Sequence, residues 1–447
     1  MLLEITRRQL LARTARAQRE GRLPSLVAGV VREGGLAWSS GHGEVEAPYD
    51  DVQYRLGSIT KTITALAVLR LRDAGRLTLS DPIELHVPGT PFGERTVGQL
   101  LAHGAGLRAE APTPWWERTP GLSWPELSAR LSAVDVPHEP GRRFHYSNLG
   151  YAVLGELLAR AHGRPWSGVV ETEVLRPLEM LRTSARPSGR AARGFAVHPH
   201  ADVLLPEPEH DAVALAPAGQ LWATLADLAR LGAFLISDGT ALLATGTLEE
   251  MAVPSGIDSS SPGWSAYGLG LQVMRHDGRT ITGHGGSMPG FLASVMVDRE
   301  QDLGSVVLCN ATSGLDPALV GDLHAVVRIA EPVLARPWRA SRDVEPAVLA
   351  LVGPWYWGPY PYALRLEAGE LHLAGTGSPG RRSRFRRQGD GSWLGLDGYH
   401  AGETMRVVGD PAAPTALDLG SFVFTRTPYD PAGPVPGGVD PGGWGAA

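Results

Sequence analysis

Ser58 and Lys61 are spaced as a nucleophile and its base, three residues apart at the start of an apolar run over residues 62–71. Lys61 is the only lysine in the chain. An arginine could replace it as a surface charge, but a guanidinium stays protonated in proteins, whereas a desolvated lysine can lose its proton. On this stretch alone, a catalytic pair and a serine that merely caps a helix are equally good interpretations.

A second candidate group, Tyr146 and Asn148, lies just before a predicted helix. A phenol near a lysine ammonium can lose its proton more easily and relay it to a leaving group. The alternative is that Ser147 or Asn148 caps the helix beside a core aromatic residue. Taken alone, this structural interpretation is the better one.

The third group is His284, Gly286 and Ser287, at the end of a predicted strand. Glycines at such a position allow a ligand to approach the backbone closely, so a substrate could lie along the strand. Taken alone, the pattern is more often a glycine-rich turn with an incidental histidine.

Together, Ser-x-x-Lys, Tyr-x-Asn and His-x-Gly in this order resemble the signature of the serine β-lactamase and penicillin-binding-protein superfamily. The branch that they resemble contains class C β-lactamases, D-aminopeptidases and family VIII-type esterases. The resemblance covers about residues 20–335 and extends to residues 96–107 and 217–222. One departure is His284-Gly285-Gly286, where penicillin-targeted members usually carry Lys-Thr-Gly, whose side chains help to hold a substrate carboxylate. A histidine anchors an anion less reliably.

The resemblance implies a role for each matching residue. Ser58 would form an acyl-enzyme, Lys61 would help to take its proton, and Tyr146 would shuttle that proton to the leaving group. The substrate-binding and oxyanion residues would be Asn148, which orients the substrate or Lys61, the backbone N–H groups of Ser58 and Ser287, and His284 with Gly286 on the opposite wall.

These features predict a serine hydrolase that acts on small-molecule esters or amides, as a carboxylesterase or a D-amino-acid amidase or peptidase. A β-lactamase or DD-carboxypeptidase is the first alternative, which the His284 motif disfavours. A slowly deacylating sensor, with a C-terminal interaction module, is the second. We expect no cofactor and no metal, since no His, Asp and Glu cluster has metal-ligand spacing.

Two further features have open interpretations. Trp115, Trp116 and Trp124, between the first two motifs, could form an apolar wall for the substrate or could pack in the core. His103 is more plausibly a structural hydrogen-bonding residue than a catalyst. Cys309, the single cysteine, lies in an apolar run and is best read as a small buried hydrophobic residue.

The composition suits a globular protein of more than one domain, with 447 residues, 43% hydrophobic residues and a net charge of -6. The arginines are scattered and form no basic stripe, so nucleic acid is not an expected partner. Residues 6–11 resemble the start of a twin-arginine signal, but the arginines that follow interrupt any apolar region. We expect an amphipathic opening helix with Leu3, Leu10 and Leu11 on one side, no membrane span and a cytoplasmic location. The sequence does not indicate an oligomeric state.

The motifs require elements to position them, and the periodicity predicts an α+β domain over residues 1–340. Its antiparallel sheet would combine an N-terminal hairpin with strands over 279–284, 291–298 and 304–310, with flanking helices. A mostly helical subdomain would occupy about 78–275. Helices are expected over 58–74, 97–102, 124–131, 149–161, 225–236 and 317–335.

After a linker near residues 337–346, short alternating segments predict a small antiparallel β-barrel of about eight strands over 345–430. It resembles the lipocalin-like barrels attached to some family members. The Pro- and Gly-rich residues 431–447 are expected to be disordered.

Overall fold

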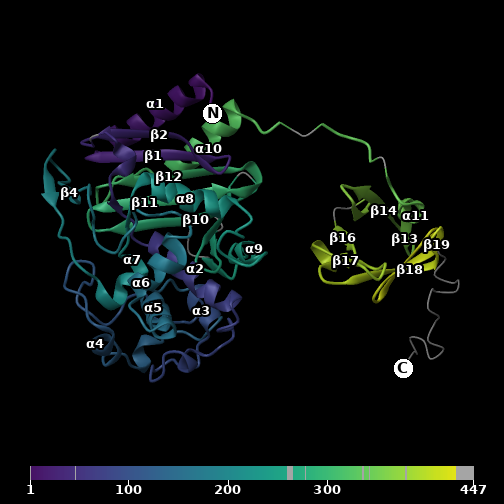
Figure 1. Ribbon diagram of the computed structural model, residues 1–447, viewed down its shortest axis with the longest axis horizontal. Coiled ribbons are helices and arrows are strands. Elements are labelled where there is room, and N and C mark those ends of the chain that lie inside the picture. Colours follow the sequence, from purple (N-terminus) through teal and green to yellow (C-terminus); the bar gives the residue numbers. More distant parts are fainter. Residues whose placement is uncertain are drawn as a thin grey trace. The chain divides into compact units, whose positions relative to one another are not determined.

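An eight-stranded antiparallel sheet organises the first of two compact units, residues 1–334 (Figure 1). The computed structural model describes residues 2–45, 47–258, 265–276, 278–334, 337–341, 343–377 and 380–428. The strand order is β2-β1-β12-β11-β10-β9-β8-β7. The strands are β1 (Ser25–Arg32), β2 (Gly35–Gly43), β7 (Gly256–Asp258), β8 (Ser265–Tyr267), β9 (Gln272–His276), β10 (Arg279–Met288), β11 (Phe291–Asp298) and β12 (Leu303–Cys309).

The predicted union of the N-terminal hairpin with the later meander is confirmed, because β1 pairs with β12 in the register Leu26↔Cys309. Alternate residues of β1 enter two different cores, as the pleat of a strand requires. Leu26 belongs to the core beneath α1 (Glu4–Glu20) and α10 (Leu319–Ala330), and Val27 belongs to the core on the other face, where α8 (Leu225–Ile236) packs (Figure 1).

The expected buried side of α1 is only partly correct. Leu10 is buried, but Leu3 and Leu11 are 57% and 48% exposed. Leu3 precedes the first helical residue, and Leu11 lies about 100° around the helix from Leu10. The helix packs instead through a stripe of Thr6, Leu10, Thr14 and Ala17.

The remaining helices of this unit lie mainly on the α8 side of the sheet (Figure 1). They are α2 (Ile59–Asp73), α3 (Val97–Leu101), α4 (Trp124–Ser128), α5 (Asn148–His162), α6 (Trp166–Val170), α7 (Ala216–Gly219) and α9 (Thr247–Met251), with a π-helical turn over Glu171–Leu175 after α6. This unit also contains two small two-stranded sheets. One pairs β3 (Tyr54–Arg55) with β6 (Trp222–Ala223), and the other pairs β4 (Phe195–Val197) with β5 (Leu204–Pro206). The α+β fold class is confirmed.

Helix α2 is buried on almost every side, as its apolar residues predicted. Its buried threonines are satisfied by backbone partners, as buried polar groups require. Thr62 donates to the carbonyl of Gly270 at 2.8 Å, and Thr64 donates to the carbonyl of Pro217 at 3.0 Å. These bonds fix the helix, and with it Ser58 and Lys61, against the surrounding chain.

The second compact unit, residues 335–447, contains a closed barrel of eight antiparallel strands preceded by α11 (Pro346–Leu351). The strands are β13 (Gly353–Trp357), β14 (Tyr360–Glu367), β15 (Glu370–Gly375), β16 (Ser383–Arg387), β17 (Trp393–Gly395), β18 (Thr404–Asp410), β19 (Ala413–Leu419) and β20 (Phe422–Thr425). Side chains such as Trp355, Leu371 and Phe385 form its core. The predicted disordered tail, 431–447, lies outside the described residues.

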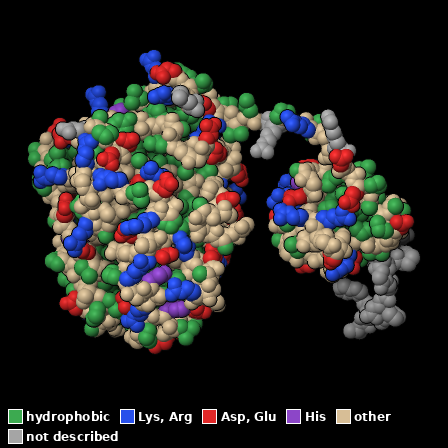
Figure 2. Space-filling view, in the orientation of Figure 1, with side chains coloured by type: hydrophobic (Ala, Val, Ile, Leu, Met, Phe, Trp, Pro, Cys, Tyr) green, Lys and Arg blue, Asp and Glu red, His purple; other side chains and the backbone are tan. Residues whose placement is uncertain are grey.

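The visible surface of the first unit carries acidic and basic side chains side by side (Figure 2). Across the described part of the chain, no helix combines the length and the apolar character that spanning a membrane demands.

Candidate active site

Ser58 stands immediately before α2, and its hydroxyl does not cap the helix. Its backbone is helical, with φ -65° and ψ -8°, and its side chain makes no capping hydrogen bond. The structural interpretation of this serine therefore loses its main support. The hydroxyl is partly exposed and faces Lys61, one turn along α2.

The Lys61 amine is fully buried and has three oxygen neighbours. Its Nζ lies 3.0 Å from Ser58 Oγ, 2.7 Å from Asn148 Oδ1 and 2.7 Å from the carbonyl oxygen of Ala218. The last two atoms can only accept hydrogen bonds. A neutral amine that donates its two N–H groups to them would direct its lone pair at the Ser58 hydroxyl.

Burial lowers the pKa of Lys61 to about 7, because the charged amine loses its hydration. The negative charges of Glu110 and Glu117 oppose this effect. Near neutral pH the amine therefore exists in both protonation states, which is the condition that a general base needs.

Asn148, the first residue of α5, is free to contact Lys61 because its neighbour caps the helix. Ser147 Oγ accepts from the backbone N–H of Gly150 at 3.0 Å. The Asn148 amide then bridges two charged groups: its oxygen accepts from Lys61, and its Nδ2 donates to Glu110 Oε1 at 2.8 Å.

Sequence reasoning missed Glu110, which extends this chain of hydrogen bonds. Its second oxygen accepts from the indole Nε1 of Trp116 at 2.6 Å. The Trp116 ring in turn lies beside Gly219, in the same neighbourhood as Gly57. An isolated glutamate in an irregular loop gives no spacing signal, so only the fold could reveal it.

The tryptophans of this loop differ in environment. Trp116 is 7% exposed and packs in the core, which agrees with the core-packing interpretation, and its ring lies near Gly219. Trp115 is 60% exposed. Trp124 is partly buried and packs against the main core.

Tyr146 lies beside Lys61, with 4.8 Å between Lys61 Nζ and the ring centroid. The expectation that the ammonium would make the phenol more acidic is wrong. Burial raises the pKa of Tyr146 above its usual value, and the nearby Ser58 hydroxyl opposes this only in part. The phenol therefore stays protonated and is suited to give and receive a proton in one step.

Behind Tyr146 lies a buried aromatic cluster that includes His103, Tyr267 and His284. His103 and Tyr146 have ring centroids 4.2 Å apart, and His103 Nδ1 accepts from the backbone N–H of Ser147 at 3.0 Å. The structural role expected for His103 agrees with this contact.

His284 is 1% exposed, so its imidazole stands behind the site rather than on its surface. Its Nε2 lies 2.9 Å from the hydroxyl of Tyr267. Burial lowers the pKa of His284 to about 3. The ring is therefore neutral at physiological pH and supplies no positive charge for an anionic substrate group.

The chain around Ser58 comes very close to strand β10. A Cβ on Gly57 would lie 2.5 Å from the backbone nitrogen of Ser287, and a Cβ on Gly286 would lie 1.8 Å from the carbonyl oxygen of Leu56. Gly57 also has φ +54°, which side chains disfavour. Because neither glycine has a side chain, the chain at Gly57 can lie against the backbone of Ser287, and Gly286 can lie against the chain at Leu56 and Ser58.

Curated relatives match about two thirds of this chain. "Protein flp" of Staphylococcus aureus (strain N315) is 23% identical over 327 residues, which cover 69% of this chain and 64% of the relative. "Beta-lactamase-like protein 2" of Dictyostelium discoideum is 25% identical over 315 residues, covering 65% and 56%. The chain thus matches less than two thirds of the length of each of these relatives.

Solved structures share the fold. A penicillin-binding protein homologue from Pyrococcus abyssi has a TM-score of 0.64 at 20% identity, covering 95% of this chain and all of the other. A D-stereospecific amidohydrolase from Streptomyces sp. has a TM-score of 0.60 at 26% identity, covering 74% and 99%. A D-amino acid amidase from Ochrobactrum anthropi SV3 has a TM-score of 0.62 at 21% identity, covering 72% and 96%.

Two family models match the chain. A domain of unknown function (DUF7586) matches residues 344–426, which contain the barrel. The model described as "Beta-lactamase" matches residues 11–327, which contain the whole eight-stranded sheet, the helices from α2 to α9 and every candidate site residue. The chain therefore belongs to the β-lactamase family.

Proposed function

We propose that this protein is a serine hydrolase that cleaves ester or amide bonds through an acyl-enzyme on Ser58. The observation that carries the proposal is the environment of the Lys61 amine. Two carbonyl acceptors at 2.7 Å occupy its N–H groups, and the Ser58 hydroxyl lies 3.0 Å away on the remaining side. That arrangement is suited to a neutral lysine base.

In the acylation step, Ser58 gives its proton to Lys61 while its Oγ bonds to the acyl carbon. The carbonyl oxygen becomes an oxyanion, which the backbone N–H groups of Ser58 and Ser287 stabilise. As the bond to the leaving group breaks, that group takes a proton from Tyr146, and the Lys61 ammonium replaces it. Deacylation reverses the relay, with water in place of the leaving group.

Among possible substrates, amides and esters of amino acids with a free ammonium group fit best. Glu110 is exposed, ends the Lys61–Asn148–Glu110 chain and brings a negative charge next to the amine. An ammonium group on the acyl part of the substrate would meet that charge. The 26% identity to a D-stereospecific amidohydrolase supports the D-amino-acid branch of this proposal.

A β-lactamase or DD-carboxypeptidase activity is less well supported. Such substrates carry a carboxylate that needs a positive partner, and the neutral His284 does not provide one. Slow deacylation, as in a sensor, would leave the same site geometry and must be distinguished by rate.

A substrate panel tests the proposal. It contains p-nitrophenyl acetate, the amides of D- and L-phenylalanine, N-acetyl-D-phenylalanine amide and a chromogenic cephalosporin, each assayed with wild type and Ser58→Ala. We expect hydrolysis of the ester and of D-phenylalanine amide, weaker hydrolysis of the acetylated amide, and no cephalosporin turnover. A Ser58→Ala protein that keeps the parent rate would reject the mechanism, and an acyl-enzyme that outlasts the assay would favour the sensor.

A further inference from the structure

A cavity of about 1120 Å³ lies between α6, residues 180–188 and the segment 211–221, apart from the candidate catalytic residues. Small-molecule sites in proteins commonly measure roughly 300–1,000 Å³, so this cavity is large enough for a ligand of several residues. We infer that it is an effector site for a short peptide with free ends. A peptide bound there would alter the rate of catalysis, because one wall of the cavity also supports the catalytic site of Ser58 and Lys61.

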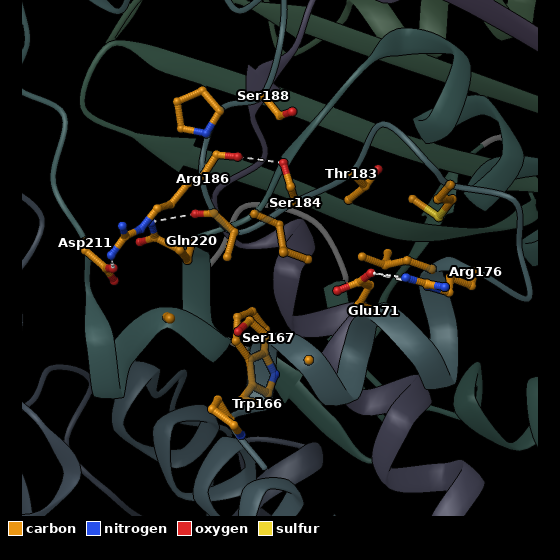
Figure 3. A pocket seen from close by; sticks show the side chains of 18 of the residues that line it. Trp166, Ser167, Glu171, Arg176, Thr183, Ser184, Arg186, Ser188, Asp211 and Gln220 are labelled. Atoms are coloured by element: carbon orange, nitrogen blue, oxygen red, sulfur yellow. Dashed lines mark hydrogen bonds and ion pairs between the residues drawn. The ribbon is translucent and has the colours of Figure 1, made fainter.

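The charges of the cavity select the class of ligand. Arg186 pairs with Asp211 at 2.9 Å on one side, and Arg176 pairs with Glu171 at 2.7 Å on the opposite side (Figure 3). The two positive and two negative groups give the lining no net charge, so it exerts no general attraction on a ligand of a single charge. A ligand with a charge of each sign at its two ends finds a partner at both sides, since a guanidinium in a single ion pair keeps spare N–H donors.

The space between the two ion pairs suits a peptide. The Trp166 indole and Ser167 stand on one side, and Thr183 and Ser184 face them from the other (Figure 3). Leu175, Met180 and Leu181 add apolar lining for side chains. Hydroxyls that can pair with peptide groups thus alternate with surfaces that can cover methyl groups, which is the mixed lining of a ligand site.

Backbone strain marks the same wall. Val213, which lines the cavity next to Asp211, has φ 48°. A β-branched residue in this region is a clear outlier, and it persists only where the surrounding structure imposes it. Such strain concentrates at ligand sites and switches, and here it is independent of the charges that point to a ligand.

The wall of the cavity is also the support of the catalytic lysine. Trp166 Nε1 donates to Thr64 Oγ1 at 3.1 Å, and Thr64 donates to the carbonyl oxygen of Pro217 at 3.0 Å. The next residue is Ala218, whose carbonyl oxygen accepts from Lys61. A ligand that packs on Trp166 therefore restricts the movement of α7. It thereby fixes the carbonyl oxygen of Ala218, which orients the lone pair of Lys61.

Binding is tested by calorimetry with trialanine on the full-length Ser58→Ala protein, which cannot turn the peptide over. We expect trialanine to bind, and blocking either end, by N-acetylation or C-terminal amidation, to weaken it at least tenfold. Arg186→Gln and Glu171→Gln in the same background should each cause a similar loss. Arg16→Gln, an exposed arginine in an ion pair on α1, is the matched control and should bind like the parent.

The proposal is overturned if trialanine does not bind, if the doubly blocked peptide binds equally well, or if neither substitution in the cavity weakens binding.

The effect of the peptide on catalysis is measured separately, as the kcat of the wild-type protein. At saturating p-nitrophenyl acetate, trialanine should raise kcat at least twofold, and Arg186→Gln should remove that rise while keeping the basal kcat. An unchanged kcat with bound peptide contradicts the shared wall. The binding arm does not depend on hydrolase activity, so the two proposals fail separately.

Discussion

Burial and nearby negative charge shift the pKa of Lys61 in opposite directions. Loss of hydration lowers the pKa of the amine to about 7, while the negative charges of Glu110 and Glu117 oppose this shift by stabilising the protonated form. The neutral form is the base in the proposed mechanism, so its fraction grows as pH rises through about 7. On the acid side of the pH–rate profile, the rate should therefore reach half of its maximum near neutral pH.

Glu110→Gln should shift that acid limb to lower pH. Removing the negative charge destabilises the ammonium form, so Lys61 loses its proton more readily. The measurement is kcat/KM for p-nitrophenyl acetate between pH 5 and pH 9. Glu94→Gln, an exposed glutamate that does not contribute to the pKa of Lys61, should keep the parent profile. An unmoved limb in Glu110→Gln would contradict this electrostatic account.

Lys61→Arg should cost at least about a hundredfold in kcat, the lower range for loss of a general base. A guanidinium keeps the positive charge but does not lose its proton in this pH range. Thermal unfolding and the circular dichroism spectrum identify variants that simply fail to fold. A folded Lys61→Arg protein with parental kcat would assign Lys61 a purely structural role.

At the scale of elements, the site depends on the close approach of the α2 start to strand β10. Gly57→Ala should lower kcat about 10²- to 10³-fold, the usual cost of an oxyanion donor, because its Cβ would displace the Ser287 backbone nitrogen. Gly75→Ala is the matched control: Gly75 also has a positive φ, but an added Cβ there meets nothing within 4 Å. Gly75→Ala should lose about 1 kcal/mol of stability from backbone strain, Gly57→Ala should lose more because of the added clash with Ser287, and only Gly57→Ala should lose activity. Equal kcat in the two would contradict the oxyanion assignment.

The elements that carry strong periodicity were predictable from the sequence. The helix over 225–236 and the strand over 291–298 match their predicted bounds, because each has a clear apolar pattern. Strand β19 (Ala413–Leu419) was missed, since the prolines and small residues before it resemble a loop.

Contacts between residues far apart in the chain were harder to predict from the sequence. The sequence singled out Ser58, Lys61 and Tyr146 by type and spacing, and the fold brings them together. The carbonyl of Ala218 and the carboxylate of Glu110 complete the surroundings of Lys61, yet neither residue has a type or spacing that predicts this contact. Likewise, the burial that sets the pKa of Tyr146 and His284 is a property of tertiary packing.

At the scale of the whole molecule, the two units have separate cores. Leu371→Ala should destabilise the barrel by about 2–5 kcal/mol, because Leu371 is fully buried in its core. Differential scanning calorimetry should show a lower transition for the barrel and an unchanged transition for residues 1–334. The kcat for p-nitrophenyl acetate should remain that of the parent below the lowered transition. A simultaneous fall of both transitions would show that the units unfold together.

The most direct test of the central claim is the intact mass of the protein after exposure to a fluorophosphonate probe. The proposed mechanism predicts a single adduct on the wild-type protein, which peptide mapping locates at Ser58, and no adduct on folded Ser58→Ala. An adduct that persists in Ser58→Ala, or a wild-type protein that stays unlabelled near pH 8, would contradict a Ser58 nucleophile.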